Sequence, residues 1–112
     1  MAAFGRLTRR VEFLSAAAKG RKAPMPGVVM QVLPRADQGP ARLGFTVTKK
    51  IGNAVIRNRT RRRLKEAARL VLAEHPLTGV DLVLIGREAT RTRDFAVLRH
   101  DILRALAKAG VA

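Results

Sequence analysis

The sequence predicts an α+β fold, a small single-domain sandwich in which helices pack on a mixed β-sheet. A length of 112 residues is enough for one hydrophobic core but not for two. The hydrophobic content of 47% is typical of a folded domain. Segments of helical and of strand periodicity follow one another in the order α-β-(β)-β-α-β-α, which predicts a single domain over residues 1–112.

The first helix is predicted from Leu7 to Ala18, before Gly20 as its end. Its apolar residues recur every three or four positions and are expected to pack on the sheet, and these are Leu7, Val11, Leu14 and Ala18. One flank of the same helix then carries Arg6, Arg9, Arg10, Phe13 and Ala17.

Three strands are predicted after this helix. Residues 21–27 hold two prolines and are predicted as a loop, with residues 21–25 as a candidate for a further short strand. Val28 to Leu33 is a β-branched strand ended by Pro34, and residues 35–41 are a turn. Residues 43–48 alternate, which places Leu43, Phe45 and Val47 on one face and Gly44, Thr46 and Thr48 on the other. The apolar run 81–86 is predicted as the central strand.

Two more helices complete the predicted fold. The longer one begins after Asn53 as its N-cap and ends near Glu74, before Pro76 and Gly79. Its stripe toward the sheet consists of Thr60, Leu64, Ala67, Ala68 and Val71. The last helix has Asp94 as its cap and an apolar stripe of Phe95, Leu98, Ile102, Ala105, Leu106 and Ala109.

The positive charge of the chain is concentrated on the longer helix. From Lys49 to Arg69 there are nine Lys or Arg and one acid, Glu66, so this segment carries +8 of the total +15. Cations packed this closely repel one another, and a polyanion relieves that repulsion because each neutralised phosphate releases counterions. The segment therefore predicts nucleic-acid binding by Lys49, Lys50, Asn53, Arg57, Asn58, Arg59, Arg61, Arg62, Lys65 and Arg69.

A second binding surface is predicted between the first helix and the sheet. Phe13 lies beside Arg6, Arg9 and Arg10, and an aromatic ring beside cations can stack on an unpaired base. Packing at the edge of the core is the alternative for Phe13. Small polar side chains on the strands, which suit hydrogen bonds to sugars and phosphates, are expected to form the floor. These floor residues are Thr46, Thr48 and Gln31.

The sequence shows no motif for catalysis by the protein itself. His75 and His100 have no acidic or histidine partner nearby in the sequence, and the eight carboxylates are scattered singly. Cysteine is absent, so a thiolate metal site and disulfides are excluded. The apolar runs are too short to span a bilayer, and no leader peptide is recognisable at the start, which predicts a cytoplasmic protein with no membrane partner.

The basic segment resembles the RNR motif of the protein subunit of bacterial ribonuclease P. The resemblance rests on Lys49-Lys50-Ile51-Gly52-Asn53-Ala54-Val55, followed by Arg57-Asn58-Arg59 and Arg62. It extends to the family's first helix through residues 6–13 and to the strand before the motif through residues 43–48. Together these segments place the resemblance over nearly the whole chain.

The resemblance implies an accessory protein of an RNA enzyme. In that family a large catalytic RNA holds the active site and its Mg²⁺ ions, and the holoenzyme removes the 5′ leader of precursor tRNA by hydrolysis. The RNR helix docks on the catalytic RNA, and the single-stranded leader lies in a groove between the first helix and the sheet. A left-handed crossover around the RNR helix is also implied. Catalytic and metal-binding residues are accordingly expected in the RNA and not in this chain.

Three departures from the family pattern and three alternatives qualify this interpretation. Ala17 and Gln31 stand where family members often carry aromatics, so the groove is expected to rely more on charge, and Arg63 replaces a common aliphatic. A ribosomal or other structural RNA-binding protein would share the composition but not the motif. A DNA-binding helix-turn-helix needs two adjacent helices, whereas a strand precedes the basic helix here. A membrane-active protein would need an exposed apolar face.

Overall fold

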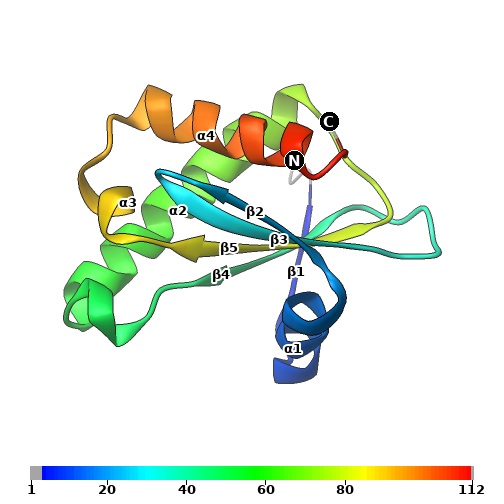
Figure 1. The fold of residues 1–112 in the computed structure, drawn as a ribbon, viewed down its shortest axis with the longest axis horizontal. Coiled ribbons are helices and arrows are strands. Elements are labelled where there is room, and N and C mark those ends of the chain that lie inside the picture. The colour runs from blue at the N-terminus through cyan, green and yellow to red at the C-terminus, as the bar shows by residue number, and fades with distance from the viewer. Residues whose placement is uncertain (1–3, 112) are drawn as a thin grey trace.

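Five strands form one mixed sheet with helices on both faces in the computed structural model, which describes residues 4–111 (Figure 1). The predicted α+β class is confirmed. In chain order the elements are β1 (Gly5–Arg6), α1 (Arg10–Lys19), β2 (Arg21–Met25), β3 (Val28–Pro34), β4 (Arg42–Thr46), the 3₁₀ turn η1 (Lys49–Ile51), α2 (Ala54–Glu74), β5 (Val80–Gly86), α3 (Glu88–Thr92) and α4 (Phe95–Lys108).

The sheet has the strand order β1-β4-β5-β3-β2, so β5 lies in the centre as predicted. Its residues are buried except for the half-buried Ile85, which explains why β5 is apolar throughout. β4 and β5 are parallel neighbours, and α2 makes the crossover between them. The left-handed sense of that crossover remains a prediction from the family resemblance.

The main core lies between the sheet and the layer formed by α2 and α4, whereas α1 covers part of the opposite face (Figure 1). The predicted stripe of α2 is buried in full, with Leu64 and Ala67 completely inaccessible. The stripe of α4 also faces this core, where Ile102 and Leu106 are both about 1% exposed. In the described residues no helix is long and apolar enough to cross a membrane.

The predicted ends of α2 and α4 are confirmed at their N-termini. Asn53 caps α2, because its Oδ1 accepts a hydrogen bond from the Ile56 N–H at 3.0 Å. Asp94 caps α4 by accepting from the backbone N–H groups of Ala96 and Val97. These side chains satisfy donors that would otherwise have no partner in the first helical turn.

The predicted stripe of the first helix is wrong except for Leu7, which is buried but precedes the helix. Val11 and Leu14 are more than half exposed, and α1 instead turns Ala16 and Phe13 toward the sheet. The helix starts at Arg10 and not at Leu7, because β1 pairs with β4 and the Leu7 N–H continues that pairing by donating to the Leu43 carbonyl. The physical reason is that the small Ala16 allows close approach to the sheet while Phe13 buries part of a large ring.

Three smaller differences concern the strands and a short helix. Residues 21–25 form β2, the further strand that was only a candidate, and Pro24 is tolerated because β2 is an edge strand. β4 ends at Thr46 and not at Thr48, because the chain turns into η1. α3 was not predicted, since five residues are too few to display a helical stripe.

Candidate nucleic-acid interface

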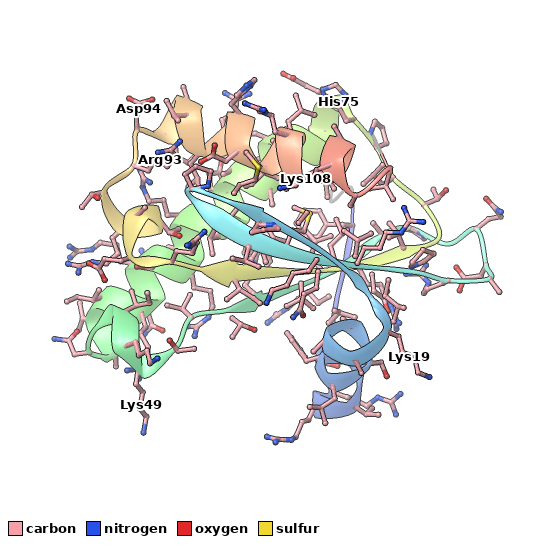
Figure 2. The ribbon with its side chains drawn as sticks, in the orientation of Figure 1. Lys19, Lys49, His75, Arg93, Asp94 and Lys108 are labelled. Atoms are coloured by element: carbon pink, nitrogen blue, oxygen red, sulfur yellow. The ribbon has the colours of Figure 1, made fainter. Side chains whose placement is uncertain are left out.

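The cationic side chains of α2 surround its buried stripe and reach the turn before the helix. Lys49 and Lys50 are exposed on η1, and Figure 2 shows Lys49 pointing away from the body of the protein. Gly52 connects η1 to α2 with a φ of +152°, and a Cβ there would lie 2.9 Å from the Ile56 side chain. Glycine at this position therefore allows the turn that presents the two lysines beside the helix.

Some of these side chains are engaged within the protein. The Arg57 guanidinium donates to the Gly52 carbonyl at 2.9 Å, and Arg61 donates to Asn58 Oδ1 at 2.9 Å. Arg69 makes a bidentate pair with Glu66, the one acid between Lys49 and Arg69. These contacts fix the start of α2 and orient part of its polar face.

Three other cations of α2 have no such partner. Arg59, Arg62 and Lys65 are exposed and make no hydrogen bond or ion pair within residues 4–111. They follow one another at intervals of three residues, so they form a continuous row on one side of the helix. This row is the part of the surface best suited to bind phosphates, since no internal partner has to be displaced.

A second concave surface, here called the α1 groove, lies between α1 and β4. It has a volume of about 320 Å³ and is lined by Arg6, Leu7, Thr8, Phe13, Leu43, Gly44, Phe45 and Arg61. The Phe13 ring is half-buried and lies directly on Gly44, where a Cβ would come within 2.5 Å of the ring Cζ. Part of the ring thus packs on the sheet, and the rest stays accessible in the groove.

The register shows which predicted groove residues share this face of the sheet. Gln31 pairs with Val83, which in turn pairs with Gly44, so Gln31 and Thr46 point to the α1 side. Both are half-buried. Thr48 lies beyond the end of β4 and is exposed. Of the eight residues predicted for the groove, Arg6 and Phe13 line it directly, whereas Arg9, Arg10 and Ala17 are exposed on α1 or at its start.

An ion-pair network that the sequence did not reveal holds α1 on the sheet. Arg42 of β4 binds Asp81 of β5 through Nε and Nη2 at 2.9 and 2.8 Å, and its Nη1 binds Glu12 of α1 at 2.9 Å. Arg35 makes a second ion pair with Asp81 at 2.8 Å. Because these residues are far apart in the sequence, the only signal was a lone Asp at the start of an apolar strand, which needs a partner when buried.

The network lowers the pKa values of two carboxyl groups, those of Asp81 and Glu12. Burial by itself would raise the pKa of Asp81, but hydrogen bonds from Arg42 and Arg35 outweigh it and hold that pKa below its usual range. The backbone N–H groups of Arg9 and Thr8 lower the pKa of Glu12, with a further contribution from the Arg42 charge. Both groups are therefore charged at neutral pH and bind the arginines as carboxylates.

No group of three or more His, Cys, Asp or Glu side chains within the described part of the chain is arranged to hold a metal ion. Both histidines are exposed, and Figure 2 shows His75 at the end of α2.

Comparisons with known proteins agree with the motif. A family model described as Ribonuclease P matches residues 1–110. The ribonuclease P protein component of Gluconacetobacter diazotrophicus is 65% identical over 106 residues, which cover 95% of this chain and 91% of that protein. The RNase P protein of Staphylococcus aureus has a TM-score of 0.77 at 25% identity and 95% coverage of both chains. The RNase P protein of Thermotoga maritima has a TM-score of 0.71 at 26% identity, with 92% of this chain and 96% of that chain covered.

Proposed function

This chain belongs to the ribonuclease P protein family, and we propose that it is the protein subunit of a ribonucleoprotein that removes the 5′ leader from precursor tRNA. Its partners are a large catalytic RNA and the leader of the substrate, and it works in the cytoplasm. The family match leaves the alternative of a ribosomal or other structural RNA-binding protein without support.

The catalytic RNA binds to the cationic side of α2. The observation that carries this proposal is the row of Arg59, Arg62 and Lys65, whose charges have no partner within residues 4–111. Phosphates of the RNA supply the missing anions, and the exchange of condensed counterions drives association. Lys49 and Lys50 extend the same surface beyond the start of the helix. No contact of this kind reads a base, so α2 recognises the shape and charge of the RNA.

The single-stranded leader binds in the α1 groove. The accessible part of the Phe13 ring stacks on an unpaired base, and Arg6 binds a neighbouring phosphate. Gln31 and Thr46 on the same face of the sheet offer hydrogen bonds to the sugar–phosphate chain. The Glu12–Arg42 ion pair keeps α1 at its place beside the sheet, so it positions Phe13 without touching the leader.

The chemistry takes place on the RNA. Mg²⁺ bound to the RNA supplies the activation of water and the stabilisation of charge that hydrolysis of a phosphodiester requires. The residues of this chain bind the catalytic RNA through α2 and bind the leader in the α1 groove. They thereby orient the leader beside the RNA. Removal of the leader leaves a 5′-phosphate on the mature tRNA.

Two affinities and a melting temperature test the leader groove in the reconstituted holoenzyme. Phe13→Ala is expected to weaken binding of leader-bearing precursor tRNA several-fold, since stacking contributes about 1–3 kcal/mol per base, and to leave binding of mature tRNA unchanged. Val11→Ala, on the exposed side of the same helix, is the matched control. Because part of the ring packs on the sheet, the melting temperature is expected to fall in either case. Equal losses for the two tRNAs would mean that Phe13 serves only the core.

A further inference from the structure

A second groove lies on the side of α2, against the short helix α3. It has a volume of about 700 Å³. From α2 it is lined by the whole unpartnered row, and from α3 by Arg91 and Thr92. α3 lies outside the RNR motif, so nothing in that motif points to this second wall.

The floor of this groove is apolar, and its rim is cationic apart from Glu66, which pairs with Arg69. Ile56 and Thr60 form part of the floor, and the Thr60 hydroxyl already donates to the Ile56 carbonyl at 2.8 Å. The Thr60 donor is therefore already used, and the floor offers mainly apolar contact. An apolar floor between cationic walls suits the sugars of a nucleic-acid strand, with phosphates held at the rim.

Arg63 fixes the distance between the two walls. Its guanidinium reaches from α2 to the backbone carbonyls of Thr90, at 2.8 Å, and of Arg93, and it lies 5.8 Å from the centroid of the Phe95 ring. These contacts hold the end of α3 and the loop that follows it, where Figure 2 shows Arg93 and Asp94. Arg63, which stands where an aliphatic residue is common in the family, therefore has a structural role.

Thr90 anchors α3 from the other side. It is fully buried, and its hydroxyl donates to the Gly27 carbonyl at 2.6 Å while accepting from the Arg87 N–H at 2.7 Å. α3 is thus tied both to α2 and to the turn between β2 and β3. A wall fixed in this way is already in place before a ligand binds, which lowers the cost of ordering the site.

The charge on the α3 wall is available to a ligand. Arg91 pairs with Glu88 at 2.8 Å, but the pair lies at the surface, with about a third of the Arg91 side chain and most of the Glu88 side chain exposed, and surface pairs of this kind contribute little. A phosphate can therefore replace Glu88 as the partner of Arg91 with little loss of stability. With Arg91 on one wall and Arg62 on the other, the groove holds cations on both sides of a bound strand.

We propose that the groove between α2 and α3 binds one sugar–phosphate strand of the catalytic RNA, and that Arg91 is an RNA-binding residue outside the RNR motif. The proposal rests on the proposed function, since it assigns a path to the RNA that α2 binds. The volume lies in the range of pockets for small ligands, so it accepts a short stretch of one strand and not a duplex.

Salt-dependent binding of the protein to its catalytic RNA tests the proposal. Arg91→Ala and Arg62→Ala are each expected to weaken binding several-fold and to lower the slope of log K against log salt by about 0.7–0.9, the loss of one phosphate contact. Arg104→Ala is the matched control, because Arg104 is exposed on α4 and does not line the groove. If Arg91→Ala behaves like Arg104→Ala, the proposed groove is wrong.

Cross-linking provides a second measurement that does not depend on affinity. The chain has no cysteine, so a photo-reactive group can be attached at a single site, in the variants Thr92→Cys on the groove wall and Ala107→Cys on the exposed side of α4. We expect cross-links to the catalytic RNA from position 92 and none from position 107, and the reverse result would overturn the proposal. If Arg62→Ala weakens binding and Arg91→Ala does not, the groove fails while the proposed function stands. If the unmodified protein does not bind this RNA, the proposed function itself fails.

Discussion

Replacing Gly44 by Ala is expected to destabilise the protein by forcing the Phe13 ring out of its place. Gly44 is buried in β4, and an added Cβ would lie within 2.5 Å of the Phe13 Cζ and 3.3 Å from the Leu7 Cβ. Carbon atoms in contact are normally about 3.5–4.0 Å apart, so the ring or the whole of α1 has to move by about 1 Å. Overpacking of this kind costs about 1–3 kcal/mol, which for a chain of this size lowers the melting temperature by roughly 4–12 °C.

A double-mutant cycle isolates this contact. Phe13→Ala alone is expected to cost about 2 kcal/mol, less than the 3–5 kcal/mol of a fully buried Phe, because the ring is half-buried. In the double variant the smaller side chain at position 13 leaves room for the new methyl group, so most of the cost of Gly44→Ala is expected to disappear. The two substitutions are therefore expected to couple by about 1–2 kcal/mol.

Thermal and urea unfolding of the four proteins measure that coupling. Gly5→Ala serves as a control, since a Cβ there would meet its nearest atom, the Arg42 Cγ, at an ordinary 3.5 Å. In the holoenzyme, Gly44→Ala is also expected to weaken binding of precursor tRNA, because the displaced ring no longer lines the groove. Strictly additive stabilities would refute the packing of Phe13 on Gly44.

Two further predictions concern the start of α2 and the behaviour of the sheet in acid. Asn53→Ala is expected to lower the free energy of unfolding by about 1 kcal/mol, because it removes the cap on the Ile56 N–H. Asn53→Asp is expected to keep most of that stability, since its carboxylate can also accept from this N–H. Urea unfolding at neutral pH measures both variants. The pKa values of Asp81 and Glu12 are lowered in the folded state, so their contribution is complete above the unfolded pKa values and is lost as the pH falls through the folded ones. Stability is therefore expected to stay level from pH 7 to about 5 and to fall below about pH 4, and an Asp81→Asn variant that falls as steeply over that range would contradict the role of the network.

The parts of the fold that the sequence predicted well are those whose signal is local. α2 shows a full stripe over 21 residues and a capping Asn53, so both its start and its buried face were predicted correctly. The same holds for α4 with Asp94. Long helices repeat the same face several times, which makes a single misplaced residue unimportant.

The buried face of the first helix was predicted wrongly because two different apolar stripes fit its sequence. Val11 and Leu14 satisfy the helical spacing as well as Phe13 and Ala16 do, and ten residues are too few for the spacing to decide. The choice is made by contacts with distant residues, namely the space above Gly44 and the pairing of β1 with β4. Neither contact can be recognised from the residues of the helix alone.

For the candidate interface, residue type was predictable but the partners of each residue were not. The density of cations on α2 predicted a polyanion-binding surface, yet only the structure separates Arg57 and Arg63, which bind backbone carbonyls, from the unpartnered row. Arg91 was not predicted because α3 is too short to show helical periodicity. The groove that Arg91 lines is formed only when α3 packs beside α2 in the folded protein.

The distribution of the acids explains why α2 keeps its excess charge. Neighbouring cations without carboxylates cost a helix a few tenths of a kcal/mol per pair, and eight acids were available to offset that cost. Within residues 4–111, Glu66 is the one acid that pairs with a cation of α2, and Glu74 at the end of the same helix pairs with Arg99 of α4. The other acids cap helices or bind arginines outside α2: Glu12, Asp37, Asp81, Glu88, Asp94 and Asp101. The buried stripe, and not local pairing, therefore keeps α2 helical. The acids stabilise the fold, whereas the charges of Arg59, Arg62 and Lys65 are not neutralised by any partner within residues 4–111.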